Sequence, residues 1–120
     1  MEFFDVIWLY DRTTRPQKEK MQVCIDFAEG WFLRINTRDV IRPCVPIPQS
    51  LNRFLDRDSH IDCSLHIVDE CEIEEVLLRD GVFGRVNLCH AADTLAALLG
   101  SIHINDRDKA QLRILFAPYT

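Results

Sequence analysis

Two histidines, an aspartate and a serine alternate with apolar residues along one short segment of the chain. They are His60, Asp62, Ser64 and His66. Side chains two residues apart lie on the same face of a strand, so the spacing predicts one polar face. Arg34 and Asn36 lie on the polar side of another predicted strand, and they join this face if the two strands pair.

Histidine and arginine side chains suit the cleavage of RNA without a metal ion. This reaction needs a base near the 2′-hydroxyl group, an acid near the leaving oxygen, and a cation near the charge that develops on the phosphorane. His60 and His66 can act as base and acid, and Arg34 can supply the cation. The same spacing is typical of the solvated face of a half-buried sheet, and this simpler interpretation stays open.

A basic segment supplies candidate binding residues, to which Asn36 is added from the predicted polar face. Residues 12–20 hold four basic groups and one acid. They fall in a predicted loop at residues 11–20, which can contact phosphate groups. The basic residues are Arg12, Arg15, Lys18 and Lys20. An ordinary exposed loop has the same composition, so this alternative is also open.

Cysteine and aromatic residues are further candidates with structural alternatives. Cys63 lies near His60 and His66 in sequence, which suggests a thiolate nucleophile. Its place in the alternation instead predicts that it points inward as a small buried residue. Three aromatic residues can stack on nucleic-acid bases: Trp8, Trp31 and Phe32. Such residues more often belong to a core or to a dimer interface.

Composition restricts the class of protein. With 120 residues, 48% of them hydrophobic, the chain is predicted to form one domain around a single core. Its net charge of −5 disfavours capture of nucleic acid by overall charge. Five cysteines without C-x-x-C spacing or an export signal predict reduced thiols in the cytoplasm, so we expect no metal and no cofactor. No apolar run approaches the ~20 residues of a membrane span, so we expect no membrane partner.

Apolar residues alternate with a period of two in the first two-thirds of the chain, which predicts strands. Two such runs within residues 21–36 flank a loop at residues 28–30, and its Gly30 can take a positive φ. This hairpin is only marginally stable in water by itself, so other strands must join it. The expected partners lie at residues 5–10, 40–48 and 60–68. Residues 49–55 predict a helical turn with Leu51, Phe54 and Leu55 facing inward.

Apolar residues three and four positions apart predict helices in the last third of the chain. The expected helices cover residues 69–79, 88–99 and 106–116, with Asp69, Asn87 and Asn105 as N-caps. The first can equally be partly strand, and residues 82–86 predict a short bridge or strand. Strands followed by helices predict a single α+β domain over residues 1–120. About five antiparallel strands are expected to curl into a small barrel within residues 1–68, with two or three helices in residues 69–120.

Four short segments follow one another in an order that is also found in a known family. They are Asp5-Val6-Ile7-Trp8-Leu9-Tyr10, Arg15-Pro16, Asp58-Ser59-His60-Ile61 and Gly84-Arg85-Val86. An apolar hairpin follows the second segment, and a helix is expected after the fourth. In this order the chain resembles the PemK/MazF-like superfamily of cell growth inhibitors, which are toxins of plasmid maintenance. The resemblance covers most of the chain.

The resemblance implies a small SH3-like barrel that forms a homodimer and, in active members, a metal-independent endoribonuclease. RNA and an antitoxin-like protein are then the expected partners. The matching positions are Arg15 or Lys20 in the first loop and Ser59 at the start of the late strand. Where the family has an aspartate–glutamine–x–arginine pattern, this chain has Cys63-Ser64-Leu65-His66. The second hypothesis is therefore a non-catalytic protein-interaction module, which uses the apolar barrel face and the acidic helix at residues 69–79.

Overall fold

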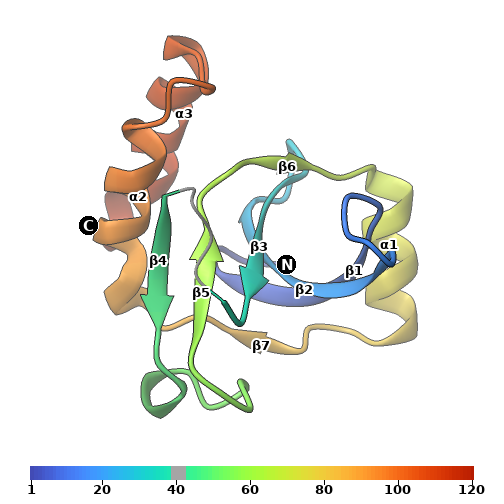
Figure 1. Cartoon of the computed structure of the whole chain (residues 1–120). Coiled ribbons are helices and arrows are strands. Elements are labelled where there is room, and N and C mark those ends of the chain that lie inside the picture. The colour runs from blue at the N-terminus through green and yellow to red at the C-terminus, as the bar shows by residue number, and fades with distance from the viewer. Residues whose placement is uncertain (39–42) are drawn as a thin grey trace.

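Two consecutive hairpins form the middle of the sheet in the computed structural model, which describes residues 1–38 and 43–120 (Figure 1). β1 (Asp5–Asp11) pairs with β2 (Lys18–Asp26), and β2 pairs with β3 (Trp31–Asn36). Gly30 ends the turn between β2 and β3 with a φ of 70°, a left-handed conformation that glycine adopts without strain. A Cβ at this position would lie 2.4 Å from the carbonyl oxygen of Val68. The predicted hairpin and its glycine are confirmed.

The first hairpin is longer than the sequence predicts. Asp11 is directly paired with Lys18, so both residues belong to strands and the loop spans only residues 12–17. The prediction of a loop over residues 11–20 was therefore wrong at both ends. Charged residues at the end of an apolar run look like loop in sequence, but here they continue the ladder.

Four short strands complete an antiparallel sheet in the order β4-β5-β3-β2-β1-β7, and β6 also pairs with β3. They are β4 (Cys44–Ile47), β5 (Ser59–Asp62), β6 (His66–Ile67) and β7 (Gly84–Arg85). Figure 1 shows that the sheet is strongly curled, as a half-barrel. The described residues thus contain seven strands rather than about five. The segment predicted at residues 40–48 is confirmed as β4, and its residues 40–42 lie outside the described residues.

The strand predicted at residues 60–68 is interrupted between β5 and β6. Asn36 of β3 is paired with His60, and Phe32 is paired with His66. Residues 60 and 66 are six positions apart, whereas their partners in β3, residues 36 and 32, are four positions apart. The segment between β5 and β6 therefore has two extra residues, which form a bulge. Because the insertion is even in number, the same face of the segment stays polar on both sides of the bulge. Ile67, which the alternation predicts to face inward, is 72% exposed.

Three α-helices follow, as predicted: α1 (Glu70–Arg79), α2 (Ala91–Leu99) and α3 (Asp106–Phe116). The side chains of Asp69, Asn87 and Asn105 accept hydrogen bonds from backbone N–H groups two or three residues ahead, which confirms all three caps. Asn87 caps a short 3-10 turn, η2 (Leu88–His90), which leads into α2. The chain ends in another 3-10 turn, η3 (Ala117–Tyr119). None of the helices in the described residues combines the length and apolar character that a membrane span requires.

The sheet lies between two apolar clusters. Leu33 of β3 belongs to a cluster with Leu98 of α2 and Leu112 of α3. Phe32, its neighbour on the opposite face, belongs to a cluster with Ile73 of α1. Burying each such side chain stabilises the fold by about 1.5–3 kcal/mol. Helices therefore cover both faces of the sheet, and the fold is α+β.

Residues 49–55 match their prediction in part, and residues 82–86 match theirs. The turn within residues 49–55 is a 3-10 turn, η1 (Gln49–Leu51), and Leu51 is 51% exposed instead of facing inward. Leu55 is buried as predicted. β7 confirms the short strand expected within residues 82–86, and it pairs with β1. The parts predicted as barrel and as helical region therefore share one sheet.

Candidate functional site

Strand pairing brings the predicted polar residues onto one face of the sheet. Gln22 is paired with Arg34, and Asn36 is paired with His60. Directly paired residues of antiparallel strands have their side chains on the same face, and the alternation extends that face along each strand. We call this set the polar face: Asp11, Lys18, Lys20, Gln22, Arg34, Asn36, His60, Asp62 and His66. Arg34 therefore lies on the same face as both histidines, which are paired with β3 residues four positions apart, Asn36 and Phe32.

The polar face continues an apolar face that α1 covers. Ile7, Leu9 and Phe32 lie on the same side of the sheet and pack in the cluster that includes Val76 of α1. Figure 1 shows α1 at one end of the sheet. Most of the polar residues lie farther along the sheet, where β2 begins and β3 ends. The sequence therefore places apolar side chains where the helix packs and polar ones where it does not.

Arg34 and Asp11 form an ion pair within the polar face. Arg34 Nε donates to Asp11 Oδ2 at 2.9 Å, and their side chains are 12% and 1% exposed. Asp11 Oδ1 also accepts from the backbone N–H and the hydroxyl group of Thr13, at 2.9 and 2.6 Å. Burial raises the pKa of Asp11, but the bonds from Thr13 and the charge of Arg34 outweigh it, so this pKa is below its ordinary value. Asp11 is thus an ionised carboxylate that joins the basic loop to Arg34.

His66 is held by Gln22. The imidazole Nδ1 lies 2.7 Å from Gln22 Oε1, so Nδ1–H donates to the amide oxygen and Nε2 carries the lone pair. Gln22 is fully buried, and its Nε2 has no hydrogen-bond partner among the described residues. Burial, followed by the charge of Arg34, lowers the pKa of His66. His66 is therefore a neutral imidazole at pH 7 with a defined tautomer.

Lys20 connects this network to a cleft. Its Nζ donates to Asn36 Oδ1, and its charge interacts with Asp11, Arg34 and Asp62. Burial lowers the pKa of Lys20, and the nearby cations act in the same direction. Lys20 is half-buried, so it contacts both the interior of the polar face and the solvent.

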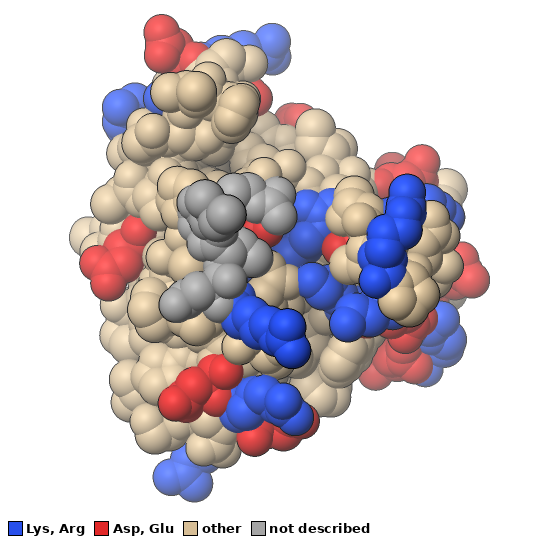
Figure 2. Space-filling view, in the orientation of Figure 1, with Lys and Arg blue, Asp and Glu red and all other residues tan. Residues whose placement is uncertain are grey.

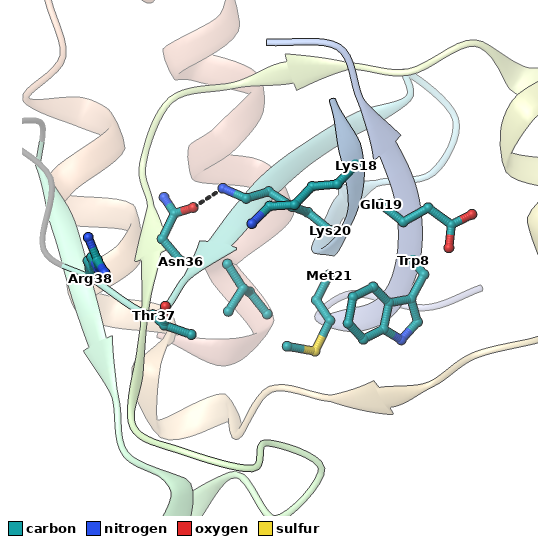
Figure 3. A pocket seen from close by; sticks show the side chains of 9 residues that line it. Trp8, Lys18, Glu19, Lys20, Met21, Asn36, Thr37 and Arg38 are labelled. Carbon is teal, nitrogen blue, oxygen red and sulfur yellow. Dashed lines mark hydrogen bonds between the residues drawn. The ribbon is translucent and has the colours of Figure 1, made fainter. Parts of the chain in front are cut away.

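The ends of β2 and β3 border a cleft of about 520 Å³, which we call the β2–β3 cleft. Its lining residues are Trp8, Lys18, Glu19, Lys20, Met21, Ile35, Asn36, Thr37 and Arg38. Figure 3 shows Lys18 and Lys20 extending toward Asn36 on one side, with Met21 and the Trp8 ring on the other. Figure 2 shows Lys and Arg side chains gathered in the middle of this side of the molecule and toward its right edge. The cleft therefore has a cationic wall and an apolar wall.

Several predicted residues lie apart from this arrangement. Ser59 is directly paired with Ile47, is buried, and donates its hydroxyl hydrogen to the carbonyl oxygen of Arg57, so it lies on the opposite face from His60. Arg12 and Arg15 are exposed in the loop of the first hairpin. The Arg12 guanidinium lies over the Tyr10 ring, and Arg15 donates to the Arg12 carbonyl oxygen.

Structural roles predicted for other residues are confirmed. Cys63 is buried, and burial raises its pKa to about 12, which leaves it a protonated and unreactive thiol. Trp31 and Phe32 are core residues. Trp8 differs from them, because it is half-buried and lines the β2–β3 cleft.

Sequence reasoning missed Asp11 and Gln22, the residues that hold Arg34 and His66. A signal for Gln22 is present in the sequence. Lys18, Lys20 and Gln22 are polar residues two positions apart, which places Gln22 on the same strand face as the two lysines. Comparison with family models, curated proteins and solved structures finds no match for this chain. The functional assignment therefore depends on the chemistry of the polar face: a neutral imidazole, a second imidazole and several cations beside an open cleft.

Proposed function

We propose that this protein binds RNA along the polar face and the β2–β3 cleft and cleaves it without a metal ion. The supporting observation is that one face of the sheet carries Arg34, His60 and His66 together with Lys18 and Lys20. The cations attract the phosphate backbone in spite of the net charge of −5. The two imidazoles supply a proton acceptor and a proton donor.

The proposed reaction assigns one role to each group. His66, neutral at pH 7, accepts the 2′-hydroxyl proton at Nε2 as the 2′-oxygen attacks the phosphorus atom. The bond to the 5′-oxygen breaks, and His60 donates a proton to that oxygen. Arg34 and Lys20 stabilise the charge on the phosphorane. The products are a 2′,3′-cyclic phosphate and a free 5′-hydroxyl group.

The same proposal extends to the fold family. The observation behind this extension is the curled antiparallel sheet with α2 and α3 after its last strand. We include in the proposal an SH3-like barrel, a homodimer, a cytoplasmic location and an antitoxin-like protein partner. Acidic antitoxin-like segments would be attracted to the cationic wall of the cleft, in competition with RNA.

Cleavage of a long RNA with and without EDTA tests this proposal. The wild-type protein is expected to cleave equally well in both, because no metal takes part in the proposed reaction. His60→Gln is expected to reduce the rate by about 100-fold or more. His103→Gln is the matched control, because His103 is exposed between α2 and α3 and should retain the wild-type rate. Intact RNA at micromolar protein, or cleavage that EDTA abolishes, would contradict the proposal.

A protein-interaction module is the second candidate, and one observation favours it. Residues 69–80 hold six acids and one arginine. A groove of about 700 Å³ lies against α1 and is lined by Tyr10, Glu19, Glu72 and Glu75, among others. Glu19 is bound by Arg79 at 2.9 Å, so part of the acidic charge is neutralised. A basic protein that binds the wild type and loses affinity for Glu72→Gln and Glu75→Gln, in a chain that binds no RNA, would favour this candidate.

A further inference from the structure

The two tryptophans of this protein have different surroundings. Trp31 is 6% exposed and belongs to the core between the sheet and the helices. Trp8 is half-buried, and its ring lines the β2–β3 cleft. Trp8 belongs to neither buried core cluster, and its ring lies in the apolar wall of an open cleft, which favours a binding role for it.

Trp8 makes two kinds of contact in that wall. It is directly paired with Met21 across β1 and β2. Its ring meets Phe83 edge to face, with centroids 5.5 Å apart and planes at 74°. Phe83 in turn contacts Phe54 edge to face at 6.3 Å. These edge-to-face contacts restrict the orientations of the ring, which lowers the entropy cost of stacking a ligand on it.

The facing wall carries the charge that a phosphate group needs. Lys18 and Arg38 are exposed at the cleft, and Lys20 is held by Asn36. Among the described residues that line the cleft, Glu19 is the one acid. Its carboxylate accepts from Arg79 at 2.9 Å, and Figure 3 shows it directed away from the two lysines. The cationic wall therefore keeps its positive charge.

On the basis of the RNA-binding function proposed above, we propose that the β2–β3 cleft is a subsite for one unpaired nucleotide. The base stacks on Trp8 beside Met21, and the phosphate group contacts Lys18 and Arg38. The cleft volume of about 520 Å³ is within the range of small-ligand sites. One aromatic and one cationic wall match the two ends of a nucleotide.

This geometry selects the conformation of the nucleic acid rather than its sequence. Every base has a π-face, so stacking on Trp8 accepts any base. A base within a duplex is stacked on its neighbours and cannot enter the cleft without leaving the helix. The protein is therefore expected to prefer single strands, loops and ends of RNA over duplexes.

Tryptophan fluorescence tests the subsite separately from RNA binding. Trp31→Phe leaves Trp8 as the one tryptophan of the chain, and Trp8→Phe leaves Trp31 as the matched control. The probes are a short 2′-O-methyl oligonucleotide, which lacks the attacking hydroxyl group, and an abasic oligonucleotide of the same length. We expect the first probe to quench Trp8 and leave Trp31 unchanged. The abasic probe is expected to bind, by anisotropy, without quenching either.

Affinity measurements give a second readout. Trp8→Ala is expected to weaken binding of the 2′-O-methyl oligonucleotide by about tenfold and to leave the abasic probe unaffected. Lys18→Gln is expected to weaken both probes, and Lys109→Gln on α3 provides a control for the loss of one charge. If Trp31→Phe does not fold, the difference in quenching between the wild type and Trp8→Phe reports on Trp8 instead.

The outcomes distinguish this subsite from the broader function. Binding of the 2′-O-methyl oligonucleotide with unchanged Trp8 emission and unchanged affinity in Trp8→Ala would overturn the subsite and leave RNA binding intact. Failure of the wild type to bind either probe would overturn the proposed function and the subsite with it. Equal affinity for a duplex and for the matching single strand would also contradict the subsite.

Discussion

His66 and His90 each contact a side-chain amide, yet their surroundings are different. His90 Nε2 lies 3.0 Å from Asn52 Nδ2, which also donates to the Pro48 carbonyl oxygen at 2.9 Å. Asn52 Oδ1 accepts from the backbone N–H of Asn87 at 2.8 Å, so every polar atom of this amide is used. Gln22 contacts His66 through one atom, and its Nε2 has no partner among the described residues.

The contrast separates a structural histidine from a functional candidate. The Asn52 network joins η1 to the start of α2 and contains no charged partner in hydrogen-bond contact, as expected of groups that stabilise a fold. The Gln22–His66 pair lies beside the part-buried Arg34–Asp11 ion pair and the cations of an open cleft. A buried group without a hydrogen-bond partner, beside an ion pair and a cleft, is typical of functional sites.

The largest expected difference between the two histidines is catalytic. His66→Gln is expected to lower the rate of RNA cleavage by about 10²–10⁴-fold, because it removes the proton acceptor. His90→Gln, measured at a temperature at which it remains folded, is expected to keep the wild-type rate. Single-turnover cleavage with both variants checks this prediction. Equal losses in the two variants would remove the distinction between them.

The next difference concerns stability. Asn52→Leu is expected to lower the free energy of unfolding by about 3 kcal/mol, because it leaves the buried His90 and the half-buried backbone groups of Pro48 and Asn87 without these hydrogen bonds. Gln22→Leu is expected to cost less than about 1 kcal/mol, since it replaces an amide that is only partly satisfied with an apolar group of similar size. Urea unfolding of both variants measures the two values. A cost for Gln22→Leu as large as that for Asn52→Leu would show that Gln22 is structural.

The smallest difference is in the dependence of stability on pH. Burial lowers the pKa of both His66 and His90 from the ordinary value of 6.5. The unfolded chain then binds more protons, so stability is complete above about pH 6.5 and is lost as the pH falls through the two folded-state pKa values. Protonation of His90 removes the acceptor that faces Asn52, whereas protonation of His66 at Nε2 preserves its bond to Gln22. His90→Gln is therefore expected to flatten the acid side of the stability curve more than His66→Gln, in urea unfolding from about pH 8 to about pH 5.

Most of the fold follows from local signals in the sequence. Asp69, Asn87 and Asn105 mark helix starts through short side chains that accept backbone N–H bonds, so these starts are readable in sequence. Gly30 marks the hairpin for the same local reason. The bulge between β5 and β6 was not predictable, because an insertion of two residues preserves the alternation on which the prediction depends.

The candidate site was predictable in part. The even spacing of His60 and His66 predicts that they share one strand face, and the alternation in the hairpin predicts that Arg34 lies on its polar side. Which strands pair is a long-range property, so the contacts of Arg34 with Asp11 and of His66 with Gln22 required the structure. Ser59 was placed by resemblance alone, and the register turns it to the opposite face.

Chemical-shift mapping locates the RNA-binding surface of the protein residue by residue. A 2′-O-methyl single-stranded oligonucleotide, added to the ¹⁵N-labelled protein, is predicted to shift the backbone signals of Lys18, Lys20, Arg34 and Asn36 on the polar face. Signals of α1 and α3 should remain in place. Shifts confined to α1, or none at millimolar oligonucleotide, would contradict the assignment of the polar face as an RNA-binding surface.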